Sequence, residues 1–278
     1  AIEPSLKITS AVYNGGNEIV LGISQNQNSV GFSRSTDNGA TFSTYQILST
    51  GGISNPALLS TGNGDMLMAV QEKNLNNTKL LLIRYSSSSG QWHDTTVALS
   101  GTDIIRNPKL YRQANGIIHL IYKKIRYTIG GYRNSDLYRI SSTDSGVTWT
   151  APTQLTRFMG EDTNPNINPQ SVLPLVIFSS YRQMPNGKIH LWWGNCTTLY
   201  DDDAPPVIYS ARIIPTLPAP GDSVSISVYA GYHKPGLTGK IEGSLNSQPV
   251  QYPLYDDGLH NGSLAGDGIF RGFIKVAA

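Results

Sequence analysis

Short apolar stretches alternate with turns rich in glycine, asparagine and serine along this chain. Leu80–Ile83 and Leu137–Ile140 are runs that end just before such turns, and Ile208–Ile213 alternates apolar with polar residues. Alternation with a period of two is typical of half-buried β-strands. No helical periodicity persists long enough to indicate a substantial helix. The pattern therefore predicts an all-β protein.

One turn phrase occurs twice, at Ser35–Phe42 and Ser142–Trp149, and both copies fit S-x-D-x-G-x-T-(W/F). A third, decayed copy at Ser86–Trp92 keeps the glycine and the tryptophan. The aspartate can accept backbone N–H groups of its own turn, the glycine supplies a positive φ, and the closing aromatic can pack on a neighbouring sheet. We interpret the phrase as a structural hairpin turn between two strands.

The turn phrases belong to a longer repeat of about 45 to 55 residues, a period that is found in propeller blades. Each unit opens with an Asn-Pro pair, at Asn55–Pro56, Asn107–Pro108 and Asn168–Pro169, and continues with an Asn-Gly turn and an inner strand. The first unit is the exception, because it has the turn and the inner strand but no Asn-Pro pair. Four units are visible, and they predict a propeller domain over residues 1–214.

In their order, these motifs resemble the Asp-box (BNR) repeats of sialidase-like β-propellers. Sialidase-like propellers have six blades, whereas propellers in general have about 4 to 8. The four visible units therefore form either a compact ring or a ring that lacks blades. Missing blades would leave apolar faces bare, so the second alternative predicts that self-association, a partner chain in a surface assembly or a lost N-terminal segment covers them.

The sequence changes character at the proline-rich joint Pro215–Gly221. Beyond it, Ser223–Tyr229 alternates strictly, which predicts a small C-terminal β-sandwich over residues 215–278. A later loop is similar to one in the Ig-like modules of bacterial and archaeal surface proteins. Its oxygen ligands could hold Ca²⁺, or its aspartates could bond their own tight turns instead. The four candidate ligands are Asp256, Asp257, Asn261 and Asp267.

Composition narrows the class of protein further. The net charge is +2 and no cluster of lysine and arginine forms a stripe, so nucleic-acid binding is not expected. No stretch approaches the roughly 20 apolar residues of a transmembrane helix. The chain begins at Ala1 without a methionine, as a processed segment would. We expect a secreted, extracellular or cell-surface protein.

The sialidase resemblance implies three arginines around a substrate carboxylate, a tyrosine nucleophile with a glutamate, and an aspartate acid/base. No arginine lies in the Arg-Ile-Pro phrase of sialidases, and neither Glu72 nor Glu161 can be paired with a tyrosine from sequence. Adjacent Trp192 and Trp193 are interpreted as strand residues that face opposite sides of a sheet. Loop aromatics and arginines are better candidates for binding a glycan by stacking and hydrogen bonds. These candidates are Arg106, Tyr132, Arg133, Tyr181 and Arg182.

The sequence thus favours a non-catalytic propeller that acts in adhesion, carbohydrate binding or extracellular assembly. A sialidase-like glycoside hydrolase is the alternative interpretation. The first predicts a large apolar contact between chains, and the second predicts a monomer with a polar central pocket.

Overall fold

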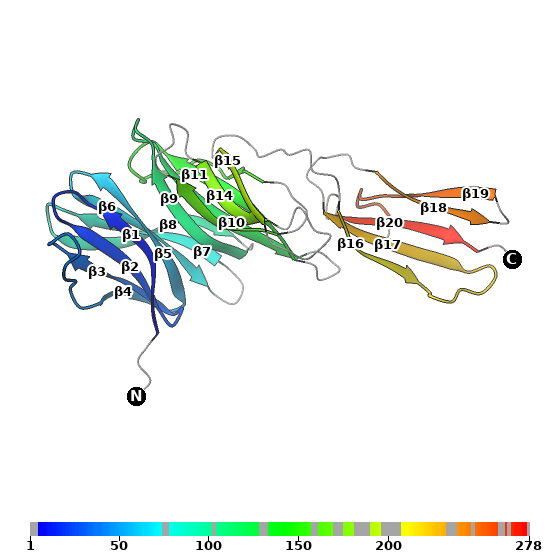
Figure 1. Cartoon of the computed structure of the whole chain (residues 1–278), viewed down its shortest axis with the longest axis horizontal. Helices are drawn as coiled ribbons and strands as arrows, with labels where there is room; N and C mark the ends of the chain where they lie inside the picture. Colours follow the sequence, from blue (N-terminus) through cyan, green and yellow to red (C-terminus); the bar gives the residue numbers. More distant parts are fainter. Residues whose placement is uncertain are drawn as a thin grey trace.

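The structure, a computed structural model of the 278-residue chain, consists of β-strands and contains no helix in its described part (Figure 1). No described helix could span a membrane. The described residues are 5–73, 78–101, 104–127, 133–156, 161–168, 175–180, 190–195, 207–231, 238–245, 248–260, 265 and 268–276. The all-β prediction is confirmed.

Within the described residues, fifteen strands form four consecutive antiparallel sheets, each built from strands that are neighbours in the sequence. The first sheet contains β1 (Leu6–Tyr13), β2 (Ile19–Gln25), β3 (Ser29–Ser35) and β4 (Gln46–Thr50). The second contains β5 (Ile53–Gly62), β6 (Asp65–Lys73), β7 (Thr78–Ser86) and β8 (Gln91–Gly101). The third contains β9 (Ile104–Arg112), β10 (Ile118–Tyr127), β11 (Arg133–Ser142) and β12 (Thr153–Gln154). The fourth contains β13 (Asp162–Asn168), β14 (Leu175–Ser180) and β15 (His190–Asn195).

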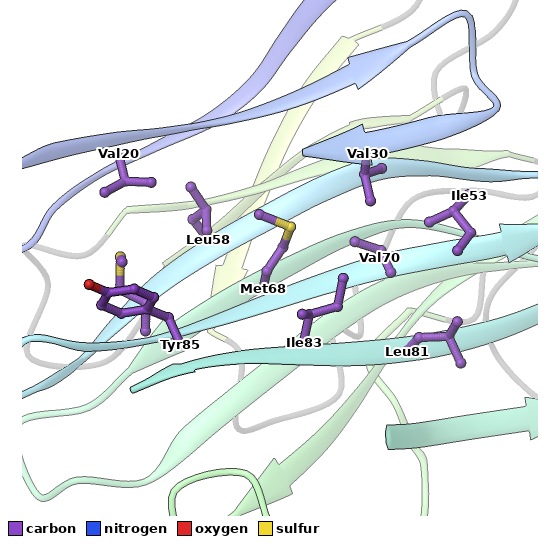
Figure 2. Close-up of a cluster of buried hydrophobic side chains, with 10 residues drawn as sticks. Val20, Val30, Ile53, Leu58, Met68, Val70, Leu81, Ile83 and Tyr85 are labelled. Atoms are coloured by element: carbon purple, nitrogen blue, oxygen red, sulfur yellow. The ribbon is translucent and has the colours of Figure 1, made fainter. Parts of the chain in front are cut away.

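Apolar side chains join each sheet to the next one along the chain. Figure 2 shows the contact between the first two sheets, where Val20 and Val30 face Met68, Val70 and their neighbours. A second cluster lies between the second and third sheets, and a third between the third and fourth. The first strands of successive sheets also pack on one another, β1 on β5, β5 on β9 and β9 on β13. This is the arrangement of propeller blades around an axis, with β1, β5, β9 and β13 as the inner strands.

Every inner strand carries one extra residue close to its beginning, which forms a β-bulge. Between the pairs Lys109–Ile121 and Arg106–Lys123, β9 runs three residues while β10 runs two. β1, β5 and β13 show the same one-residue shift against their partner strands. In the last three inner strands an Asn-Pro pair occupies the bulge, and the asparagines at 55, 107 and 164 have φ of 54°, 54° and 51°. Asparagine tolerates this left-handed conformation better than most residues. The bulges therefore explain the repeated Asn-Pro pair.

This geometry corrects one detail of the sequence interpretation. The fourth unit was predicted to open at Asn168–Pro169, but the pair in the bulge is Asn164–Pro165. Asn168 is the last residue of β13. Two Asn-Pro pairs lie four residues apart here, and only the register with β14 distinguishes them.

The repeated turn phrase connects the third and fourth strands of the first and third sheets. In the first copy Thr41 donates from N and Oγ1 to the Asp37 carboxylate at 2.9 and 2.6 Å, and Ser35 Oγ donates to it at 2.7 Å. Asp144 receives the matching bonds from Thr148 and Ser142. The closing Trp149 packs against the cluster between the second and third sheets, whereas Phe42 is largely exposed.

These hydrogen bonds predict a pH dependence of stability. Bonds from Thr41 and then Ser35 hold the pKa of the Asp37 carboxyl at about 2, below its usual value of 3.8. Because the folded-state pKa is lowered, the stabilisation is present above about pH 4 and is lost as the pH falls toward 2. We expect Asp37→Asn to lower the melting temperature at pH 7 and to have little effect at pH 2. An equal effect at both pH values in thermal unfolding would contradict this assignment.

The remaining five strands form a separate small sandwich. One sheet contains β16 (Val207–Ile214), β17 (Ser223–Gly231) and β20 (Ile269–Lys275), and the other contains β18 (Gly239–Leu245) and β19 (Gln248–Leu254). Their facing sides bury a common cluster that includes Ile226, Leu254 and Phe270. β16 pairs with β17, so residues 207–214 lie in the C-terminal sheet although the sequence places them in the propeller domain. The division at 214/215 stays a prediction.

Candidate active site

A polar cavity of 320 Å³ lies where the four inner strands begin. Its walls come from Lys7 and Thr9 on β1, Asn55 on β5, Asn107 and Lys109 on β9, and Asn164 and Asn166 on β13. A second cavity of 430 Å³ lies among later residues of the same strands, including Val12, Leu59, Leu110 and Ile167. The inner strands therefore run in the same direction along the axis, with a cavity toward each end.

The two ends of the axis carry different sequence motifs. The turn phrases follow the third strand of a sheet, which runs parallel to the first, so they lie at the end where the inner strands finish. At the other end, where the inner strands begin, hydroxyl, amide and ammonium groups line the cavity together with Ile8 and the prolines of the Asn-Pro pairs. We call this cavity the axial pocket, and its lining suits a ligand rich in hydroxyl groups.

Hydrogen bonds orient the amides of the axial pocket. Asn107 Nδ2 donates to Asn164 Oδ1 at 3.4 Å, which links the third and fourth sheets. Asn55 Nδ2 donates to Gln71 Oε1 at 3.4 Å. Lys109 is half-buried, and its burial lowers the pKa of the ammonium group. The pocket thus contains amide donors and acceptors that long hydrogen bonds connect to neighbouring strands.

Buried charged groups gather beside the start of β13. Lys123 is almost fully buried and donates from Nζ to Thr163 Oγ1 at 2.8 Å. Asp162 is fully buried, and its backbone oxygen accepts a hydrogen bond from Ser135 Oγ at 3.0 Å. The backbone of Glu161 forms an isolated parallel β-bridge with that of Ser135, and the Glu161 side chain is only half-buried. The start of β13 is thereby fixed to the third sheet.

A second accessible carboxylate belongs to the second sheet. Glu72 pairs in register with Ile53 at the beginning of β5, so it lies at the same end of the axis. Its Oε2 lies 3.2 Å from Lys79 Nζ, and the side chain is partly exposed. Among the described acidic side chains at this end, Glu72 and Glu161 remain in contact with solvent. Two such carboxylates are the groups that glycoside hydrolysis requires.

Only part of the predicted glycan-binding set can be placed. Arg106 is half-buried on β9, opposite Lys123, and its Nε makes no hydrogen bond within the described part of the chain. Arg133 is the first residue of β11. Tyr132, Tyr181 and Arg182 lie outside the described residues. The structure brings Arg106 to the strand beginnings and leaves the rest of the set as a prediction.

The interpretation of the two tryptophans is confirmed. Trp192 pairs with Phe178 and packs on the cluster between the third and fourth sheets. Trp193 pairs with Ile177, faces the other side and is 65% exposed.

Sequence reasoning missed most of the axial pocket. The Asn-Pro pairs were read only as markers of where each unit begins, although their asparagines line the pocket. The repetition itself was the available signal, since equivalent positions in successive blades meet at the axis. Lys109, Lys123 and Asp162 gave no signal of their own.

The predicted calcium loop is described only in part. Asp257 Oδ1 accepts hydrogen bonds from Leu259 N and His260 N at 2.9 and 3.3 Å, and His260 Nδ1 lies 3.0 Å away. The bond with His260, followed by that from Leu259 N, lowers the pKa of Asp257. Asp256 Oδ2 accepts from Gly268 N at 3.0 Å. Asn261 and Asp267 lie outside the described residues, so the calcium site stays a prediction.

Comparison with known proteins shows which fold this chain has. The sequence matches no family model and no curated protein sequence. In structure, it is similar to the α-L-arabinofuranosidase Arb93A of Fusarium graminearum, with a TM-score of 0.52 and 11% identity over 97% of this chain and 93% of that one. The α-L-arabinanase of Penicillium chrysogenum has a TM-score of 0.51 and 12% identity, over 96% of this chain and 92% of that one. The chain has the fold of β-propeller glycoside hydrolases.

This comparison corrects the main functional interpretation of the sequence. A non-catalytic protein for adhesion, carbohydrate binding or assembly was expected, largely because the arginine phrase of sialidases is absent. The matching propellers are instead glycoside hydrolases. The missing phrase argues only against one substrate carboxylate and its arginine clamp, and leaves glycoside hydrolysis in general open.

Proposed function

We propose that this protein is a glycoside hydrolase whose substrate binds at the axial pocket. The observation that supports this most is the polar pocket where the four inner strands begin, with Glu72 and Glu161 at the same end of the axis. Amide and ammonium groups of the pocket would bind sugar hydroxyls. The two carboxylates would supply the acid and the base or nucleophile.

Glu161 is the proposed general acid. It directly precedes β13, its backbone forms a β-bridge with Ser135, and Ser135 Oγ donates to the backbone oxygen of the next residue, Asp162. In the proposed reaction it donates a proton to the leaving-group oxygen while the glycosidic bond breaks. Glu72, on a different blade, would act on the sugar from the opposite side, either activating water or attacking the anomeric carbon.

Buried groups near Glu161 have a positioning role in this proposal. Lys123 and Asp162 are shielded from solvent, so neither would touch substrate directly. The bond from Lys123 Nζ to Thr163 Oγ1 and the bond from Ser135 Oγ to Asp162 O hold the strand beginnings of the third and fourth sheets together. Arg106, which pairs in register with Lys123, is the described arginine best placed to bind a substrate oxygen.

A neutral furanoside or pyranoside is the proposed substrate class. Support comes from the fold, since the similar chains are described as an arabinofuranosidase and an arabinanase. A sialoside is a less suitable substrate, because the described part of the pocket supplies lysines and amides rather than an arginine clamp. Sialosides nonetheless belong in any assay of activity.

Three finer assignments remain part of the proposal. The turn phrases are assigned to Asp-box repeats, supported by the matching hydrogen bonds of Asp37 and Asp144. The C-terminal sandwich is assigned to the Ig-like modules, supported by its two facing sheets. Location outside the cell follows from the same two resemblances.

The proposal is tested with aryl α-L-arabinofuranosides, β-xylosides and α-sialosides and the purified chain. We expect hydrolysis of at least one pentoside, and we expect Lys109→Met to raise KM about ten- to a hundredfold through loss of a charged hydrogen bond to the sugar. Arg112→Met is the matched control, because Arg112 lines the cavity at the other end of the axis. No release of aryl alcohol from any substrate, or equal effects of both variants, would refute the proposal.

A further inference from the structure

One lysine of the axial pocket has an unusual environment. Lys109 is half-buried in β9, and its ammonium group makes no hydrogen bond or ion pair with any described residue. Two other lysines of the propeller that are withdrawn from solvent have partners, Lys79 at Glu72 and Lys123 at Thr163. Lys109 is therefore partly shielded from water without a group that compensates its charge.

The register of the third sheet shows where the Lys109 side chain points. Lys109 pairs with Ile121, and directly paired residues of antiparallel strands point to the same side of a sheet. Ile121 packs on the fourth sheet, so Lys109 points toward the fourth sheet as well. Asn164 and Asn166 of that sheet line the same cavity of 320 Å³. The amine thus lies in a polar cavity of a size that suits a small molecule.

Partial burial without a compensating charge changes the chemistry of an amine. Loss of contact with water disfavours the ammonium form, so burial lowers the pKa of Lys109. A larger fraction of the neutral amine is then present near neutral pH than at an exposed lysine. Only the neutral amine has a lone pair that can attack a carbonyl carbon, and desolvated lysines act as Schiff-base nucleophiles for this reason.

We propose that Lys109 is a covalent binding site for hydroxyaldehydes, the chemical class that includes the open-chain form of reducing sugars. Lys109 Nζ adds to the aldehyde carbon and gives a carbinolamine. The hydroxyl of the carbinolamine then leaves with the remaining proton of the nitrogen as water, and the C=N bond forms. No oxidant or reductant takes part, so water reverses the reaction.

The side-chain amides of the pocket give this site its preference for hydroxyl groups. Asn107 and Asn166 line the cavity together with Lys109, and an amide both donates and accepts hydrogen bonds. An aldehyde that carries hydroxyls can therefore bind these amides while its carbonyl carbon reacts. The reaction uses the pocket but not glycoside hydrolysis, so it goes beyond the proposed function.

Reductive trapping on the intact chain tests the proposal. The folded chain is incubated with glyceraldehyde and sodium cyanoborohydride, which reduces the C=N bond to a stable secondary amine, and peptide mass spectrometry measures the label on each lysine. Lys7 is the matched control, because it lines the same cavity but is exposed. At pH 7 Lys109 is expected to be labelled severalfold faster than Lys7, and its rate should level off at a lower pH.

Two further measurements make the result specific to the pocket. In guanidinium chloride both lysines are solvated alike, so the ratio of their rates should fall to about one. Propanal has the same three carbons as glyceraldehyde but no hydroxyl group, and it should show a smaller preference for Lys109.

The proposal has clear contrary outcomes. Equal or slower labelling of Lys109 in the folded chain, coincident pH profiles of Lys109 and Lys7, or a preference that survives unfolding would overturn it. An equal preference with propanal would remove the selectivity for hydroxyaldehydes and overturn that part. No step requires glycosidase activity, so a chain that hydrolyses nothing leaves this test intact.

Discussion

Replacing Glu161 by glutamine is expected to lower kcat by about a hundred- to ten-thousandfold with little change in KM, because general acid catalysis contributes about that much to rate. Glutamine keeps the size and the backbone bridge to Ser135 but has no proton to donate to the leaving group. The measurement is steady-state kinetics on an alkyl glycoside of the same pentose as the aryl pentoside that the wild-type chain hydrolyses, because an alkyl alcohol needs protonation to leave.

The choice of leaving group sharpens this test. A substrate with an acidic phenol needs little protonation, so its loss of rate in Glu161→Gln should be much smaller than that of a substrate with an alkyl alcohol. Glu242→Gln is the matched control, because Glu242 is exposed in the C-terminal sandwich beside Lys240. An unchanged kcat in Glu161→Gln, with hydrolysis by the wild type established, would remove Glu161 from the site without removing the activity.

Replacing Met68 by alanine is expected to destabilise the fold by about 2–5 kcal/mol. Met68 is fully buried between the first two sheets, where Val20, Leu58 and Ile83 surround it (Figure 2). Alanine removes three heavy atoms from the centre of the contact between two blades, and the backbones of four-stranded sheets cannot close the resulting cavity.

Chemical denaturation monitored by tryptophan fluorescence measures this loss. Val147→Ala is the control, because Val147 lies in a turn phrase, is 69% exposed and should change the free energy of unfolding by less than about 0.5 kcal/mol. A loss below about 1 kcal/mol for Met68→Ala would mean that the first two sheets do not pack as one unit.

The sequence predicted the fold better than the site, for a physical reason. Strand alternation and turn chemistry are local, so residues such as Asp37 and Gly39 indicate a turn from the sequence alone. Trp192 and Trp193 could likewise be assigned to opposite faces. The axial pocket, by contrast, exists because Asn55, Asn107 and Asn164 of three different blades lie close together. No local sequence pattern indicates how close residues of different blades lie. Glu161 was noted as a loop residue, but its bridge to Ser135 depends on two sheets packing together.

The wrong functional expectation has a similar origin. The turn phrases resemble those of sialidases, so the absent arginine phrase of that family argues against a sialidase, but it says nothing about hydrolysis of other glycosides. The turn phrases lie at the end of the axis away from the pocket, so their resemblance carries information about how blades are built and little about what the pocket binds.

The four bulges determine which side of each inner strand its side chains face. Residues of a strand alternate between its two faces, and one extra residue reverses the alternation for everything on one side of it. β1, β5, β9 and β13 each contain this single extra residue at about the same height. A deletion of one residue there would keep the strand but would remove the bulge, whose Asn55, Asn107 or Asn164 lines the pocket, and would reverse the side chains that precede it. At these four bulges, the number of residues in the strand matters to the pocket as much as the residue type does.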